Sequence, residues 1–154
     1  MAARVDDPLI GRTLGGCRLQ KKIGSGGMGT VYLCEQLSLE RSVVVKVLHG
    51  ELTRRPEFVK RFEREAKAAA KLFHPNVVQV LEYGQVDSVY YIIMEYVDGV
   101  TVKDMIEDRG SIPLDRTVRV VADVARGLGA AHRSGIVHRD VKPANVMINS
   151  EGTV

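Results

Sequence analysis

The chain has 154 residues, a length that suits one domain or one and a half small ones, and its 45% hydrophobic and 27% charged residues are ordinary for a globular protein. Its formal net charge of +3, with basic residues scattered among acidic ones, is too small to indicate a nucleic-acid partner. No stretch approaches the ~18 uninterrupted apolar residues of a membrane helix, and the N-terminal sequence lacks the apolar segment of a signal peptide. The two cysteines form neither a disulfide framework nor a metal motif, so we expect a cytoplasmic chain without a membrane segment.

The first part of the chain favours strands. Residues 17–23 and 30–36 alternate between apolar and polar types on either side of a glycine-rich stretch, which predicts a hairpin. The apolar run 42–48 predicts a strand buried on both faces. Further strands are expected at 77–83 and 89–97.

A helix is expected between these strands. Pro56 suits a first helical position, and the sequence HPN at 74–76 should end the helix because the residue before a proline disfavours the α conformation. An apolar stripe runs along this helix at Phe58, Phe62, Ala69 and Phe73.

After Gly99 the sequence predicts mainly helices. Thr101, with Asp104 three residues later, resembles a capping box for a short helix that ends near Arg109. A longer helix is expected over 114–134, with Gly135 as its C-terminal cap. Its apolar stripe consists of Val118, Val121, Ala125, Leu128 and His132. The whole pattern predicts an α+β fold with a strand-rich front, a helical back and a ligand cleft between them.

Two charged residues interrupt apolar positions. Lys46 lies inside the run VVVKVL, and Glu65 follows Phe62 by three residues, which places it in the apolar stripe of the helix. A buried charge needs a partner, and each of these residues is the best partner for the other. The alternative is a solvated lysine on an edge strand and a solvated glutamate on the helix surface.

The glycine-rich stretch has the sequence GSGGMGTV and fits the pattern G-x-G-x-x-G-x-V at Gly24, Gly26, Gly29 and Val31. Glycines let a backbone approach phosphates closely and direct N–H groups at them. A dinucleotide-binding fingerprint would need a helix directly afterwards, whereas TVYLCEQ predicts a strand. A structural hairpin is the other alternative, and the lysine in the following strand favours a nucleotide cover.

With HRDVKPAN at 138–145, these motifs make the chain resemble a eukaryotic-like Ser/Thr protein kinase of the bacterial type, from about Ile10 to Val154. The alternative for HRDVKPAN alone is a polar turn before a strand. The resemblance implies a kinase-like fold: an N-terminal extension over 1–10, a complete β-rich N-lobe over 11–97 and the first part of a helical C-lobe over 98–154.

The resemblance also implies the residues of the site. Asp140 would accept the proton of the substrate hydroxyl, Lys142 would steady the γ-phosphate, and Asn145 would hold one Mg²⁺ through its amide oxygen. Lys46 would hold the α- and β-phosphates and Glu65 would orient it. The residues expected around ATP are Ile23, Gly24, Ser25, Gly26, Gly27, Met28, Gly29, Thr30, Val31, Val44, Lys46, Glu65, Met94, Glu95, Val97 and Met147.

The D-F-G motif of the family is absent from these residues. The family places it about a dozen residues after the catalytic-loop asparagine, which falls just beyond Val154. We therefore expect a truncated Ser/Thr kinase domain that is inactive by itself, which uses ATP, Mg²⁺ and protein substrates when complete. A short chain that binds nucleotide or a kinase partner without catalysis is the alternative, and the coding DNA beyond Val154 would distinguish the two.

Overall fold

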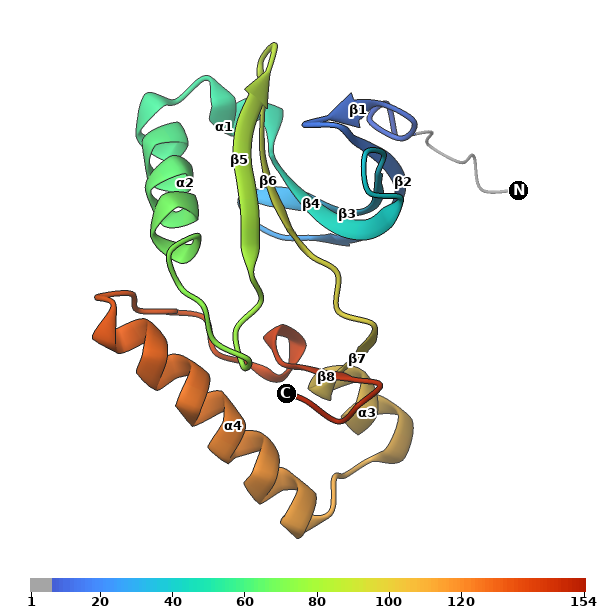
Figure 1. The fold of residues 1–154 in the computed structure, drawn as a ribbon, viewed down its shortest axis with the longest axis vertical. Coiled ribbons are helices and arrows are strands. Elements are labelled where there is room, and N and C mark those ends of the chain that lie inside the picture. The colour runs from blue at the N-terminus through green and yellow to red at the C-terminus, as the bar shows by residue number, and fades with distance from the viewer. Residues whose placement is uncertain (1–6) are drawn as a thin grey trace. The chain divides into compact units, whose positions relative to one another are not determined.

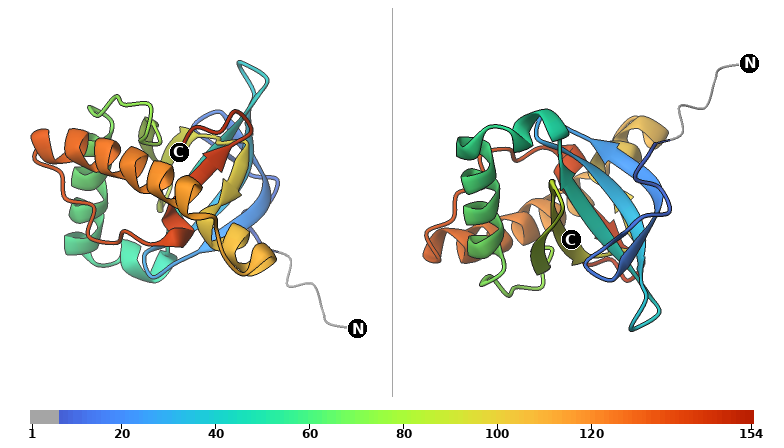
Figure 2. Two further views of the ribbon diagram at one scale, coloured as in Figure 1. Left: turned by 90° about the horizontal axis from the view of Figure 1, so that it is seen from below. Right: turned by 90° about the horizontal axis from the view of Figure 1, so that it is seen from above.

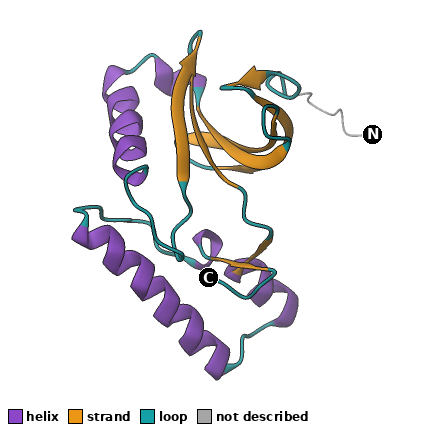
Figure 3. Ribbon diagram, in the orientation of Figure 1, coloured by secondary structure: helices purple, strands orange, loops and turns teal. Residues whose placement is uncertain are grey.

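The computed structural model describes residues 7–154, which form two compact units. The first contains the described residues up to Ala70 together with Val80–Tyr96, and the second contains Lys71–Gln79 together with Val97–Val154. Strands predominate in the first unit and helices in the second (Figure 3). The segment 71–79 thus belongs to the second unit, whereas the expected division assigned all of residues 11–97 to the N-lobe.

The first unit is built on an antiparallel sheet with the strand order β1-β2-β3-β4-β6-β5 (Figure 1). Neighbours along most of this order are also neighbours in sequence, so short turns connect them. The strands are β1 (Thr13–Leu14), β2 (Cys17–Ser25), β3 (Gly29–Gln36), β4 (Arg41–Leu48), β5 (Val80–Val86) and β6 (Val89–Glu95).

One face of this sheet carries the larger apolar core. Alternate residues of β3, β4 and β6 point to this face, because successive side chains of a strand project to opposite sides. Its buried members are Leu14, Cys17, Leu19, Tyr32, Cys34, Val43, Val45, Val47, Tyr91 and Ile93. Leu9 packs against this core, and the Tyr32 hydroxyl donates to Asp7 at 2.7 Å. Residues 7–10 of the expected N-terminal extension are therefore part of the first unit, whereas residues 1–6 lie outside the described residues.

Helices α1 (Gly50–Thr53) and α2 (Pro56–Ala69) complete the first unit, and α2 lies beside β5 in Figure 1. The α2 residues Phe62 and Ala66 pack with Leu48, Val80 and Ile92 in a second apolar cluster. Pro56 is at the helix start as expected, but α2 ends at Ala69 instead of continuing to the HPN sequence.

The expected place of Phe73 in the α2 stripe is wrong. Phe73 lies beyond the helix and is 78% exposed. Its neighbour Leu72 is buried with Ala130 and Ala131 in the second unit. The chain leaves the helical path before Leu72 because burying this leucine in another cluster requires it. A turn around His74 follows, and β5 consequently begins at Val80, three residues later than expected.

The second unit combines helices with a short strand pair (Figure 2). Its elements are β7 (Gly99–Thr101), α3 (Val102–Arg109), α4 (Leu114–Arg133), the 3₁₀ helix η1 (Pro143–Asn145) and β8 (Met147–Asn149). Val102 and Met105 of α3, Val120 of α4 and Ile148 of β8 share one apolar cluster. This cluster packs β8, which begins two residues after the end of η1, against α3 and α4.

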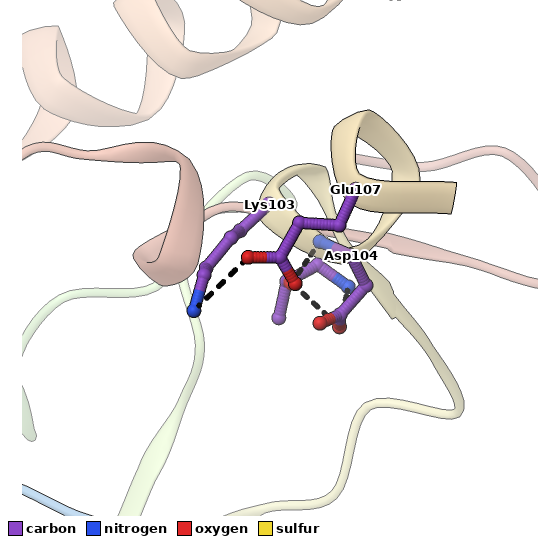
Figure 4. A network of polar contacts seen from close by, with 4 residues as sticks. Lys103, Asp104 and Glu107 are labelled. Atoms are coloured by element: carbon purple, nitrogen blue, oxygen red, sulfur yellow. Dashed lines mark hydrogen bonds and ion pairs between the residues drawn. The ribbon is translucent and has the colours of Figure 1, made fainter. Parts of the chain in front are cut away.

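The capping box predicted for α3 is confirmed. Thr101 Oγ1 accepts from the Asp104 N–H at 3.0 Å, and the Asp104 carboxylate accepts from the Thr101 N–H at 3.2 Å. Figure 4 shows Asp104 at the helix start beside Lys103 and Glu107, which form an ion pair of 3.4 Å. Helix α4 also forms where expected, and Gly135 has the positive φ of +74° that a C-terminal cap requires.

Helix α4 has two apolar faces. One face buries Val120, Gly127, Ala130 and Ala131. The stripe predicted from the sequence is a different one, and its residues Val118 and Val121 are 59% and 60% exposed. No helix among residues 7–154 is both long and apolar enough to cross a membrane.

Candidate functional site

The glycine-rich segment forms the tip of the β2–β3 hairpin, as predicted. Ser25 pairs with Thr30, and the Gly26 N–H donates to the Gly29 carbonyl at 2.9 Å across the tip. Gly29 lies against β4 so closely that a Cβ atom would stand 2.3 Å from the Val47 carbonyl oxygen. Only glycine fits this position, because the backbone of the turn rests directly on the neighbouring strand.

The segment that follows the glycines is strand β3 and not a helix. A dinucleotide-binding fingerprint requires a helix whose N-terminus meets the pyrophosphate. The dinucleotide-binding alternative is therefore wrong.

Four of the predicted nucleotide-contacting residues share one face of the sheet. Val31 pairs with Lys46, and Val44 pairs with Met94, which places all four side chains opposite the Tyr32 core. Each of these residues is only half-buried, whereas Val43, Val45 and Val47 on the other face are buried. The expected strand buried on both faces is thus fully buried on one face only. This arrangement leaves a partly open apolar surface with one cation on it.

The predicted buried position of Glu65 is wrong. Glu65 is exposed, with a side-chain accessibility of 53%, and accepts from Arg61 Nε at 2.9 Å. The buried face of α2 is centred on Phe62 and Ala66. A residue three positions after Phe62 lies at the flank of that face, within reach of the arginine one turn earlier. In the described part of the chain, no ion pair connects Lys46 to Glu65.

The remaining predicted nucleotide residues are divided between the two units. Ile23 is 49% exposed beside the glycine turn, the Ser25 and Thr30 hydroxyls lie 3.4 Å apart, and Glu95 is the last residue of β6. Val97 and Met147 belong to the second unit, where Met147 pairs with Thr101 across β7 and β8. The predicted nucleotide-contacting residues therefore belong partly to the first unit and partly to the second.

The three predicted catalytic residues come together in the second unit. Lys142 Nζ lies 2.9 Å from Asp140 Oδ2, and Asn145 Nδ2 donates to the same oxygen at 3.1 Å. Asn145 Nδ2 also donates to the Asp140 main-chain carbonyl at 2.8 Å. The turn has this form because Arg139 adopts a left-handed φ of +64° and η1 then returns Asn145 to the aspartate.

The Asp140 carboxylate is stabilised in its ionised form. The hydrogen bond from Lys142 is the main cause that lowers the pKa of Asp140 below its ordinary value, and the hydrogen bond from Asn145 lowers it further. The Asp140 N–H donates to His138 Nδ1 at 3.2 Å, which helps to fix the aspartate backbone. At neutral pH the loop thus presents a solvent-facing carboxylate with two donors on one of its oxygens.

Asn145 has the chemistry that its predicted Mg²⁺ contact needs. Its amide nitrogen makes both hydrogen bonds to Asp140, so its amide oxygen is the remaining group and is a hard oxygen ligand of the kind Mg²⁺ prefers. Among residues 7–154, no three His, Cys, Asp or Glu side chains gather as a metal site. Among the described residues, the amide oxygen of Asn145 is therefore a group that could hold Mg²⁺.

Two contacts near the site were not predicted. His49, which the sequence did not distinguish, contacts the Gly26 carbonyl with its Nε2 atom at 2.8 Å. Arg61 holds Glu65 as described above. His49 follows Leu48, which pairs with Gly29, and its main-chain N–H donates to the Met28 carbonyl at 3.0 Å. No pattern in the sequence indicated the first contact, because it depends on the pairing of β3 with β4.

The sequence of this chain is similar to those of known protein kinases. Residues 17–154 match the model of the protein kinase domain. The chain is 45% identical to a probable serine/threonine-protein kinase of Clostridium perfringens and 39% identical to the serine/threonine-protein kinase PrkC of Bacillus subtilis. Each alignment covers 95% of this chain but only 22% and 23% of the relative, so the chain spans about a fifth of their length.

A solved structure agrees with these matches. The crystal structure of the PknI kinase domain of Mycobacterium tuberculosis superposes with a TM-score of 0.81 at 36% identity. The superposition covers 93% of this chain and 58% of that structure. The expected kinase-like fold is confirmed.

Proposed function

Because the chain belongs to the protein kinase family, we propose that the protein transfers the terminal phosphoryl group of ATP to Ser or Thr hydroxyls of protein substrates. The observation that supports this most strongly is the Asp140–Lys142–Asn145 cluster, with its contacts of 2.9 and 3.1 Å to one carboxylate oxygen. Phosphoryl transfer needs mainly positioning and charge neutralisation, which these three residue types supply.

The first unit offers the surface that we assign to ATP. Val31, Val44 and Met94 supply an apolar patch suited to an adenine ring, and Lys46 supplies one cation for the phosphates. The glycine turn next to them brings backbone N–H groups close to this cation. Ile23, Glu95, Val97 and Met147 are the further adenine contacts that we propose.

The second unit offers the groups that we assign to the hydroxyl and the metal. Asp140, ionised at neutral pH, would accept the hydrogen bond of the Ser or Thr hydroxyl, orient it and then take its proton. Lys142, which now contacts this carboxylate, would neutralise charge on the transferred group. Asn145 would contribute its amide oxygen to bound Mg²⁺, which supplies charge neutralisation at the phosphates.

The first unit has to rearrange before Glu65 can orient Lys46. Glu65 is now engaged by Arg61 on the exposed flank of α2. An exposed ion pair of this kind contributes about 0–1 kcal/mol, so exchanging Arg61 for Lys46 costs little. We propose that the described conformation is one in which the Lys46–Glu65 pair is not yet formed.

Phosphotransfer to a Ser/Thr-rich protein such as casein tests this proposal. A longer polypeptide that includes this chain and a D-F-G motif should label Ser and Thr, and its Asp140→Asn variant should lose at least about 100-fold in rate, since it lacks the carboxylate that orients the hydroxyl. As a control, circular dichroism should show that the Asp140→Asn variant has the same fold as the unaltered polypeptide. Equal rates for the two proteins would contradict the proposal.

A polypeptide of these 154 residues alone should behave differently. No D-F-G sequence occurs in it, so one metal ligand of the family is lacking. We expect such a polypeptide to bind ATP without appreciable transfer, which is also what a non-catalytic nucleotide-binding chain would do. Robust turnover by this polypeptide would refute the expectation.

A further inference from the structure

His49 connects the end of β4 to the glycine turn through two separate hydrogen bonds. Its main-chain N–H donates to the Met28 carbonyl at 3.0 Å, and its imidazole Nε2 lies 2.8 Å from the Gly26 carbonyl oxygen. A carbonyl oxygen only accepts, so Nε2 must carry the proton in this contact. Gly26 is exposed at the tip of the hairpin, and Met28 is half-buried against the cluster that contains Leu48.

His49 is itself firmly placed. Its carbonyl accepts from the N–H groups of Leu52 and Thr53 at 2.9 and 3.3 Å, so His49 is the N-cap residue of α1. Leu48, immediately before it, is buried in the cluster that contains Phe62. The imidazole therefore projects from a fixed backbone, at the junction of β4 and α1, towards the glycine turn.

These contacts determine which groups of the turn are free. The carbonyls of Gly26 and Met28 are directed to His49, and the Gly26 N–H is used by Gly29. Within residues 7–154, the N–H groups of Gly27 and Met28 donate to no protein acceptor. Successive N–H groups of a turn that have no protein acceptor are the kind of groups with which such turns bind anions, including phosphate.

We propose that His49 is a positioning residue that holds the glycine turn in the conformation that presents the Gly27 and Met28 N–H groups to the phosphates of a nucleotide. This inference rests on the ATP site of the proposed function and adds a residue to it. Glycines have the largest conformational freedom of any residue, so a turn with Gly26, Gly27 and Gly29 loses much entropy when it orders around a ligand. A histidine that orders the turn beforehand reduces this cost and strengthens binding.

Two substitutions separate the hydrogen bond from the shape of the side chain. His49→Phe keeps a ring of similar shape but removes the donor, and His49→Gln returns an N–H donor at a similar reach. The Gly26 N–H donates to the Gly29 carbonyl across the turn, so its exchange reports the order of the turn. Backbone amide exchange of Gly26, measured by NMR without nucleotide, should accelerate in His49→Phe and return towards the original rate in His49→Gln. Unchanged exchange in His49→Phe would overturn the proposal.

Ligand titrations then test the consequence for phosphate binding. Affinity for Mg²⁺-ATP should fall about 2- to 10-fold in His49→Phe, the range expected from one hydrogen bond, and should recover in His49→Gln. Affinity for adenosine, which has no phosphates, should stay the same in all three proteins. An equal loss for adenosine and ATP would indicate general damage to the site and would overturn the positioning role.

The amide exchange also separates this inference from the proposed function. If none of the three proteins binds ATP, the ATP site of the proposed function is wrong, and so is the phosphate role of His49. Exchange rates without nucleotide still decide in that case whether His49 orders the turn. His132→Gln, at an exposed position of α4 in the second unit, is the matched histidine control and should change neither measurement.

Discussion

Asp140 shows how three residues within one short loop determine the chemistry of a carboxylate. Its Oδ2 accepts from Lys142 Nζ at 2.9 Å and from Asn145 Nδ2 at 3.1 Å, and both donors favour the ionised form of the carboxylate. The aspartate is solvent-facing, so the two donors, and not burial, control its proton affinity.

The first prediction concerns this proton affinity. Lys142→Met removes the donor with the largest effect, so the pKa of Asp140 should rise towards its ordinary value. An NMR titration of the side-chain carboxyl carbon measures it directly. Lys103→Met, which removes an ion pair with Glu107 in α3, is the control and should leave the pKa of Asp140 unchanged. A pKa of Asp140 that is the same in Lys142→Met and the unaltered protein would show that Lys142 does not control it.

Individual residues were predicted unevenly. The resemblance of HRDVKPAN to the catalytic loop of protein kinases indicated Asp140, Lys142 and Asn145 as site residues, and the structure adds the contacts between them. The partner of Glu65 was not predicted, because a position on the flank of a helix can face either the core or the preceding turn. Arg61 is four residues earlier on the same helix, and a local partner needs no tertiary contact to form.

At the scale of single elements, helix α3 depends on its N-terminal cap. The Thr101 hydroxyl and the Asp104 carboxylate satisfy each other's backbone N–H groups, which would otherwise lack partners at the helix start. Thr101→Ala should lower the free energy of unfolding of this unit by about 0.5–2 kcal/mol, measured by urea denaturation.

Thr101→Ser is the matched control for the cap. Serine keeps the hydroxyl that accepts from Asp104, so this variant should retain nearly all of the stability. If alanine and serine at this position gave the same stability, the capping box would contribute nothing.

The sheet core makes a prediction at alkaline pH. Burial is the main cause that raises the pKa of the Cys34 thiol to about 12, and burial with the hydrogen bond to Asp7 raises the pKa of Tyr32 as well. In the unfolded chain these groups lose their protons near pH 8.5 and 10, while the folded chain keeps them. The free energy of unfolding should therefore be fully present below about pH 8.5 and decrease as the pH rises towards 12, by up to about 1.4 kcal/mol per pH unit for each group.

Denaturation between pH 8 and 11 in the presence of a reducing agent tests this prediction. The Cys34→Ala variant should be less stable at every pH because it leaves a cavity, but its stability should decrease less steeply with pH. The test is the slope of the unfolding free energy against pH, because the cavity lowers the stability of the variant at every pH. Parallel slopes for the two proteins would contradict the assigned role of Cys34.

The elements themselves were largely predictable. Apolar alternation located β2 and β3, and apolar runs located β4 and β6. The cap signals located α3 and α4 to within a residue or two. The end of α2 and the start of β5 were not predictable from local pattern, because Leu72 is drawn into a cluster with residues almost sixty positions later. Short elements such as β1, α1 and β7 carry too few residues for a period to be recognised.

At the scale of the whole molecule, the two units contain complementary halves of the proposed chemistry. The first carries the glycine turn, Lys46 and the apolar patch, and the second carries the Asp140 loop. Both units contribute to residues 17–154, which match the protein kinase domain. The exposed stripe of α4 at Val118 and Val121 leaves the second unit with an apolar surface of its own.

Calorimetric titration of Mg²⁺-ATP into the chain tests the central claim most directly. We expect one ATP to bind, and the Lys46→Ala variant to bind about 10- to 100-fold more weakly, the range expected when a hydrogen bond from a charged donor is lost. Circular dichroism should show the variant to be folded, since Lys46 is half-buried without an ion partner among the described residues. Absence of binding by the unaltered chain, or equal affinities of the two proteins, would contradict the account.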